Sequence, residues 1–294
     1  MSRAAGFYAR PPMPPPPPMF NQGPKNSVSD SPLSIEDRDA LCRAAQLLES
    51  PGFFIRAVNM VGAPIDAVFK RLPGGAGEMV RKAVTVSLER ALDIALYRVH
   101  RGWGLFHHEN LMKILCAGTG AVGGTFGLPA LAIELPVSTC MMLRSIAEIA
   151  RAEGEDLQSP GGRLACLEVF ALGGNSPGDD AAESAYFVVR AGLGQEVRAA
   201  LQYLAKEPTD RAAAPVIVRF VQAVAQRFGI QVSEKVAAQA VPAIGAIGGA
   251  AINAGFMNHF QDMAHGHFTV RRLERRYGEE LIRQEYSRCR KPRA

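Results

Sequence analysis

Two long stretches without a charged residue constrain this chain more than any other feature of its sequence. One covers the 20 residues between Lys113 and Glu134, and the other covers the 26 residues between Lys235 and Asp262. As a helix, either stretch is long enough to cross the ~30 Å hydrocarbon core of a bilayer. Both are rich in glycine and alanine and each contains a proline, so their hydrophobicity is weak for independent membrane helices. Three interpretations stay open: buried core helices of a bundle, lipid-embedded segments that are covered by protein, or, between these two, attachment to the surface of a membrane.

A glycine pattern inside the first stretch raises the question of a nucleotide site. Residues 118–124 read GTGAVGG, which contains the G-x-G-x-x-G spacing of dinucleotide-binding loops. A dinucleotide fold also needs several strand–helix units, and the sequence contains no recognisable one. The pattern recurs instead as GAIGG at 245–249, and in both copies glycines four residues apart would line one helix face and allow close packing. We therefore expect no nucleotide, and we assign the following glycines to helix packing: Gly120, Gly123, Gly124, Gly127, Gly245, Gly248 and Gly249.

The pattern of apolar residues predicts an all-α protein. Apolar side chains recur at helical spacing over 78–100, and no stretch shows the alternation of a strand. Residues 1–32 hold nine of the 20 prolines, which predicts a disordered proline-rich arm. We expect a multi-helix bundle over 33–287, followed by a basic tail over 288–294. Within the bundle, the two glycine-rich segments span 114–136 and 236–257, and further helices are expected at 134–152, 160–172, 181–206, 215–228, 234–258 and 259–287.

Positive charge is concentrated at the C-terminal end. The chain carries a net charge of +5, and its last 26 residues, 269–294, contain nine basic and four acidic residues. A terminal basic patch is attracted to anionic lipid or to nucleic acid. Because the segment shows no interleaving of aromatic and basic residues that would favour nucleic acid over lipid, we expect lipid and no nucleic acid, with a solvated basic helix as the alternative. The expected lipid contacts are Arg271, Arg272, Arg275 and Arg276.

The five cysteines indicate a reducing compartment. Their number is odd, and no two of them have the spacing of metal ligands. The N-terminal residues also lack the apolar region of a signal peptide. We therefore expect a cytoplasmic protein, and we assign it neither a metal nor a cofactor.

His259, Asp262 and His265 are the candidates for catalytic or metal chemistry. Successive helical residues turn by about 100°, so the three side chains share a face about 120° wide. Histidine and aspartate in that arrangement bind metals or exchange protons. Their spacing differs from the i, i+4 histidine pair of zinc proteases, and Gly266 is a candidate for a break in the helix before His267. The alternative, which we favour over an enzyme, is a hydrogen-bonded polar collar where an apolar helix leaves its buried surroundings.

Several stretches, in their order and spacing, resemble the EcsC family. They are Glu134-Leu135-Pro136, MMLRSIAEIARAEGEDL at 141–157, CLEVFALGG at 166–174, VPAIGAIGGAAIN at 241–253 and HFQDMAHGHFTVRRLERRYG at 259–278. The resemblance covers roughly residues 80–280 and implies a helical, bacterial, membrane-associated protein of the cytoplasm. The family takes its name from a protein encoded beside an ABC transporter that is involved in secretion and protein processing. It has no established catalytic residues, so the resemblance assigns none here.

Three functional hypotheses follow. The first is a non-enzymatic helical protein, peripheral to or partly embedded in the inner membrane, that binds lipid and serves an ABC transporter, secretion or envelope process. The second is a peptidase-like or metal-dependent hydrolase that uses His259, Asp262 and His265. The third is a protein that binds a lipid or another apolar ligand in a glycine-lined interior.

Overall fold

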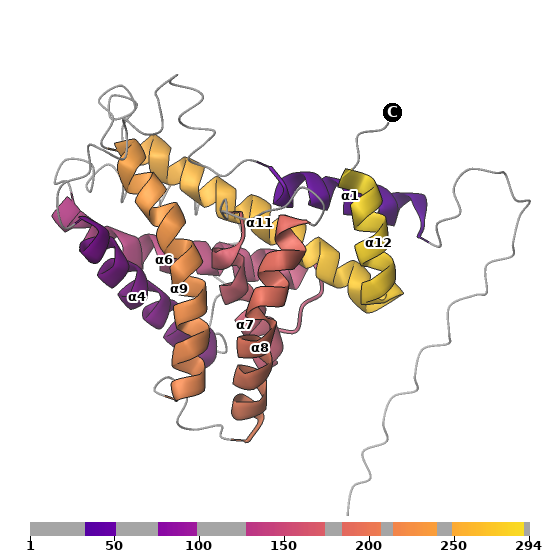
Figure 1. The fold of residues 1–294 in the computed structure, drawn as a ribbon, viewed down its shortest axis with the longest axis horizontal. Coiled ribbons are helices and arrows are strands. Elements are labelled where there is room, and N and C mark those ends of the chain that lie inside the picture. The colour runs from indigo at the N-terminus through magenta and orange to yellow at the C-terminus, as the bar shows by residue number, and fades with distance from the viewer. Residues whose placement is uncertain are drawn as a thin grey trace, which may run out of the picture. The chain divides into compact units, whose positions relative to one another are not determined.

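The computed structural model describes residues 33–50, 76–98, 128–173, 184–206, 214–239 and 249–290. The regular structure of these residues is entirely helical, which confirms the predicted all-α bundle (Figure 1). The chain divides into two units, residues 1–32 and residues 33–294, and the predicted proline-rich arm lies outside the described residues. The elements are α1 (Ile35–Leu48), α4 (Ala76–Asp93), the π-helical turn η1 (Ile94–Arg98), α6 (Leu128–Ala152), α7 (Pro160–Glu168), the 3₁₀ turn η3 (Val169–Ala171), α8 (Ala185–Lys206), α9 (Pro215–Gln239), α11 (Gly249–Tyr277) and α12 (Glu279–Arg290).

Serine side chains begin two of these helices. Ser34 Oγ accepts a hydrogen bond from the backbone N–H of Asp37 at 3.1 Å, and Ser159 Oγ accepts one from Gly162 at 3.1 Å. Each bond satisfies a donor that the first turn of a helix otherwise leaves without a partner.

α11 is the helix against which most of the others pack. It is 29 residues long and contacts α1, α6, α9 and α12. Its buried face carries phenylalanine rings, and the centroid of Phe260 lies 5.3 Å from Phe170 and 5.6 Å from Phe228. Both neighbouring rings are tilted or edge-on to Phe260, the arrangement that aromatic pairs favour. These contacts hold α11 against η3 and α9.

Three predicted helix boundaries are wrong. The sequence places a boundary at 258–259 and a candidate break at Gly266, yet α11 continues to Tyr277. Gly266 does not end the helix, because its missing side chain makes room for α1: a Cβ atom there would lie 2.5 Å from Leu48 Cγ. α9 likewise continues through the predicted gap at 229–233. Packing against neighbouring helices outweighs the low helix propensity of glycine at these positions.

A disulfide connects the first and the last described helices. Cys42 of α1 is bonded to Cys289 of α12, with 4.9 Å between the Cα atoms, while Cys140 and Cys166 are free. The expectation of reduced cysteines is wrong for this pair, because the partners are 247 residues apart and only the fold brings them together. α1 and α12 contact each other and both contact α11, and α12 runs across α1 (Figure 1). We call these two helices and their disulfide the terminal clasp.

Candidate functional site

The predicted residues His259, Asp262 and His265 all lie on α11, in different surroundings. His259 is 1% exposed and packs against Gly173, where a Cβ atom would lie 2.5 Å from His259 Cε1. The backbone of Gly173 has φ +76°, a conformation that favours glycine. Asp262 and His265 are partly exposed, and the described residues contain no group of three or more His, Cys, Asp or Glu side chains that could hold a metal ion. The hydrolase hypothesis stays a prediction.

Sequence reasoning missed a buried polar chain that begins at His267. Tyr186 O–H donates to His267 Nδ1 at 3.1 Å, and Arg190 donates to the same Tyr186 oxygen at 3.2 Å. Arg190 also pairs with Glu274 at 2.6 Å. Burial, followed by the charge of Arg190, lowers the pKa of His267 well below its ordinary value, so the ring is neutral and Nδ1 can accept. Through these two hydrogen bonds and this ion pair, side chains of α8 connect that helix to α11.

The four arginines that are predicted to meet anionic lipid form ion pairs with carboxylates of the protein itself. Burial alone would raise the pKa of Asp37, but hydrogen bonds from Tyr277 and Arg272 lower it below its ordinary value. The pKa of Glu155 is lowered too: burial alone would raise it, but the hydrogen bonds and positive charges of Arg271 and Arg275 together outweigh that effect. Both carboxylates are therefore ionised at neutral pH. The pairs are Arg271–Glu155 at 2.6 Å, Arg275–Glu155 at 2.5 Å, Arg272–Glu153 at 2.7 Å and Arg276–Asp37 at 2.8 Å.

Four arginines against three carboxylates leave this arginine cluster with a net charge of +1. Arg275 and Arg276 are its accessible members, with 44% and 62% of their side chains exposed. The lipid contact of the four arginines stays a prediction. Its expected strength is lower than the sequence indicates, because the partners already neutralise most of the charge.

One charge from the border of each uncharged stretch forms a buried ion pair: Glu134 follows the first stretch, and Lys235 precedes the second. Lys235 Nζ donates to Glu134 Oε1 at 2.7 Å, and the two side chains are 0% and 6% exposed. The Lys235 ammonium also lies 5.2 Å from the centroid of the Phe256 ring. The start of α6, the end of α9 and the start of α11 therefore meet in one place. We call the helix ends 128–137, 233–239 and 249–256 the apolar end.

Exposed aliphatic side chains lie on α6 at the apolar end. Ile133 is 76% exposed, and Val137, one turn further along, is 39% exposed. Gly249 begins α11, and the other glycines assigned to helix packing lie outside the described residues, so their packing stays a prediction. None of the described helices combines the length and the apolar character needed to span a membrane.

A model of the EcsC protein family matches residues 59–273, which is more than half of the chain. The chain belongs to the EcsC protein family. No curated protein and no solved structure gives a significant match to it. The EcsC match contains the helix ends that form the apolar end, whereas α1 precedes it and α12 follows it. The terminal clasp is therefore built from two helices outside the part that matches the EcsC family.

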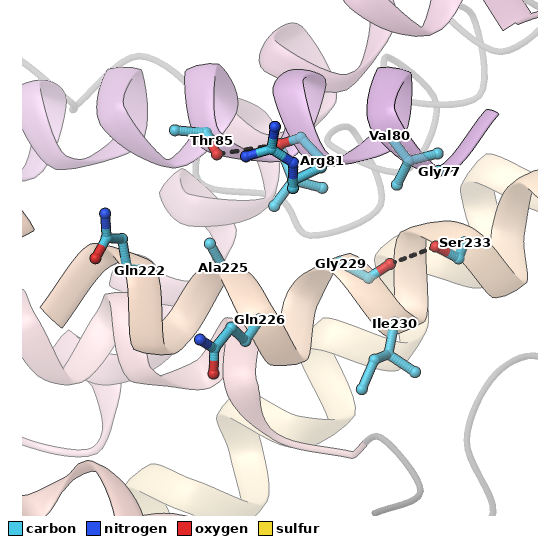
Figure 2. A pocket seen from close by; sticks show the side chains of 11 residues that line it. Gly77, Val80, Arg81, Thr85, Gln222, Ala225, Gln226, Gly229, Ile230 and Ser233 are labelled. Carbon is cyan, nitrogen blue, oxygen red and sulfur yellow. Dashed lines mark hydrogen bonds between the residues drawn. The ribbon is translucent and has the colours of Figure 1, made fainter. Parts of the chain in front are cut away.

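A groove of about 550 Å³ lies between α4 and α9, inside the EcsC match (Figure 2). The helices run antiparallel, so that Thr85 and Gln222 lie toward one end of the groove and Gly77 and Ser233 toward the other (Figure 2). Ser233 belongs to the apolar end, so the groove reaches that end of the protein.

Glu234 of the apolar end is expected to make the stability depend on pH. It is half-buried, and burial raises its pKa from 4.5 to about 7. The folded protein therefore keeps this proton to a higher pH than the unfolded chain, so the free energy of unfolding falls as the pH rises from about 4.5 to about 7. We expect Glu234→Gln to remove this decline and to add about 1–2 kcal/mol at pH 8, as measured by urea unfolding. A variant with the wild-type pH profile would contradict the prediction.

Proposed function

We propose that this protein is a non-catalytic, membrane-associated member of the EcsC family that attaches to a membrane surface through its apolar end. The observation that carries the proposal is the buried ion pair between Glu134 and Lys235. Glu134 follows the first uncharged stretch and Lys235 precedes the second, so their pairing brings one border of each stretch to the same end of the bundle. Two uncharged, glycine-rich segments then adjoin one end of the bundle.

Exposed aliphatic side chains at that end support attachment by burial in the interfacial region of a bilayer. Ile133 is the most exposed of them, at 76%. Transfer of one such side chain out of water contributes about 1.5–3 kcal/mol, and the segments that adjoin it add further apolar area. We place the attachment on the cytoplasmic side of the inner membrane and its purpose in a transporter, secretion or envelope process.

The arginine cluster has a secondary part in this proposal. Arg271 follows Phe256 by 15 residues on α11, which corresponds to about 22 Å along the helix axis. One flat membrane surface therefore meets both the apolar end and the arginine cluster only when α11 lies along that surface. We assign the attachment to the apolar end, and we assign the arginines chiefly to holding α1 and the turn that follows α6 against α11.

Vesicle flotation with two matched variants tests the proposal. Ile133→Glu places a charge at the apolar end, and Ile35→Glu makes the same change on α1, where the side chain is 80% exposed. We expect Ile133→Glu to reduce binding to vesicles of phosphatidylethanolamine and phosphatidylglycerol about tenfold, since that loss corresponds to about 1.4 kcal/mol. Ile35→Glu is expected to bind as the wild type does. Equal flotation of both variants would contradict attachment through the apolar end.

Fractionation of cells separates apolar attachment from attraction of charges. Washing membranes with concentrated salt weakens contacts between arginines and anionic lipid, whereas it leaves buried apolar surface in place. We expect the protein to stay in the membrane fraction after the salt wash. Complete release by salt would assign the attachment to the arginine cluster instead.

A further inference from the structure

The groove between α4 and α9 has an aliphatic floor. Val80 and Val84 of α4 are 4% and 1% exposed, and Ala225 and Ile230 line it from α9. Its volume of about 550 Å³ falls in the range of small-molecule sites. An apolar trough of this size, open to water when empty, favours an occupant that removes its surface from water.

The polar side chains that line the groove mostly have partners on their own helices. Thr85 Oγ1 donates to the carbonyl of Arg81 at 3.1 Å, and Ser233 Oγ donates to the carbonyl of Gly229 at 2.8 Å (Figure 2). Arg81 itself makes two hydrogen bonds to Glu78, at 3.0 and 2.5 Å. These bonds use part of the hydrogen-bonding capacity of the lining within its own helices, and the aliphatic floor then favours a hydrocarbon.

Gly229 keeps the groove open at a cost to its helix. It lies inside α9, where glycine is the poorest residue after proline. A Cβ atom at this position would meet nothing within 4 Å, so neither close helix packing nor backbone conformation explains the glycine. Gly77 on the opposite wall also faces open space. Larger side chains at these two positions would fill the volume that the glycines leave free.

We propose that this groove binds the hydrocarbon chain of a lipid. The choice of a lipid rests on the membrane attachment proposed above, because the groove reaches the apolar end at Ser233. A docked amphipathic helix fits less well: two turns of helix, about 10 Å across and 11 Å long, displace more than the volume of the groove. The exposed amides of Gln222 and Gln226 stand at the edge of the groove, where a polar headgroup can meet them.

Calorimetric titration with palmitate, below the concentration at which it aggregates, tests the proposal. We expect the full-length protein to bind palmitate saturably and Gly229→Leu to bind it at least tenfold more weakly. Because leucine favours the helix, we expect Gly229→Leu to unfold at an equal or higher urea concentration than the wild type. If Gly229 had only a structural role, its replacement would lower the stability together with the binding. Weaker palmitate binding at unchanged or higher stability therefore excludes a purely structural role for Gly229.

A matched control is available on α8. Gly192 is exposed, helical and also without a neighbour within 4 Å of a Cβ atom, so Gly192→Leu makes the same change outside the groove and is expected to bind palmitate as the wild type does. Wild-type protein that binds no palmitate, or Gly229→Leu that binds it normally, would overturn the proposal. Binding of an amphipathic helical peptide in place of palmitate would overturn it in favour of a protein partner.

Flotation separates this proposal from the proposed function. We expect Gly229→Leu to lose palmitate but to float with vesicles, and Ile133→Glu to bind palmitate but to float poorly. Loss of flotation in Gly229→Leu would overturn the separate roles of groove and apolar end. Failure of Ile133→Glu to change flotation would count against membrane attachment alone, since palmitate binding is measured without a membrane.

Discussion

Replacing Lys235 with methionine is expected to lower the free energy of unfolding by about 3–5 kcal/mol. Lys235 is fully buried and donates to Glu134 at 2.7 Å, so the substitution leaves a carboxylate in the interior without its cation. Methionine has nearly the same length as lysine and fits the space of its side chain. The decrease in the free energy of unfolding therefore comes from removal of the charge and not from a cavity. Urea unfolding measures the change. A decrease in the free energy of unfolding below about 1 kcal/mol would contradict a buried ion pair between Lys235 and Glu134.

The double variant Lys235→Met/Glu134→Leu is the control for this prediction. It removes both charges, so no isolated ion remains buried, and replacement of such pairs by apolar residues is often neutral or stabilising. We expect the double variant to recover most of the stability that either single variant loses. A double variant as unstable as the sum of the single ones would show that the two side chains act independently.

Much of the fold follows from the sequence, because helical periodicity does not depend on distant contacts. The helix expected over 78–100 corresponds to α4 and η1, and the one expected over 181–206 corresponds to α8. The start of α6 is different: the sequence places it at 134, but the helix begins at Leu128 and contains Pro136. A proline removes one backbone donor, and the packing of α6 against α4 and α11 outweighs that loss.

The candidate site was less predictable, since it depends on pairs that lie far apart in the chain. Glu134 and Lys235 mark the borders of the uncharged stretches, but their spacing of 101 residues does not show that they meet. His267 was missed because its partner, Tyr186, lies on another helix, 81 residues earlier. The sequence did contain a signal for a polar role of His267. It stands four residues before Arg271, so the two side chains share one face of the helix.

The disulfide of the terminal clasp is expected to contribute about 2–4 kcal/mol to the stability of the oxidised protein. It closes a loop of 247 residues, so it restricts the unfolded chain strongly in the chain-entropy account of disulfides. We expect Cys289→Ser to unfold at a lower urea concentration than the wild type in the absence of reductant. Cys140→Ser is the control because Cys140 is a free cysteine, and it is expected to keep the wild-type stability.

The fold itself is expected to survive loss of the disulfide, because α1 has other attachments. Leu48 fills the space beside Gly266, Asp37 pairs with Arg276 at 2.8 Å, and Tyr286 of α12 donates to Glu49 at 3.0 Å. Helical content measured by circular dichroism should therefore match between Cys289→Ser and the wild type. Addition of dithiothreitol should bring the wild type down to the stability of the variant and leave the variant unchanged. A difference that persists in reductant would assign the effect to the serine side chain, and equal stability without reductant would contradict formation of the disulfide.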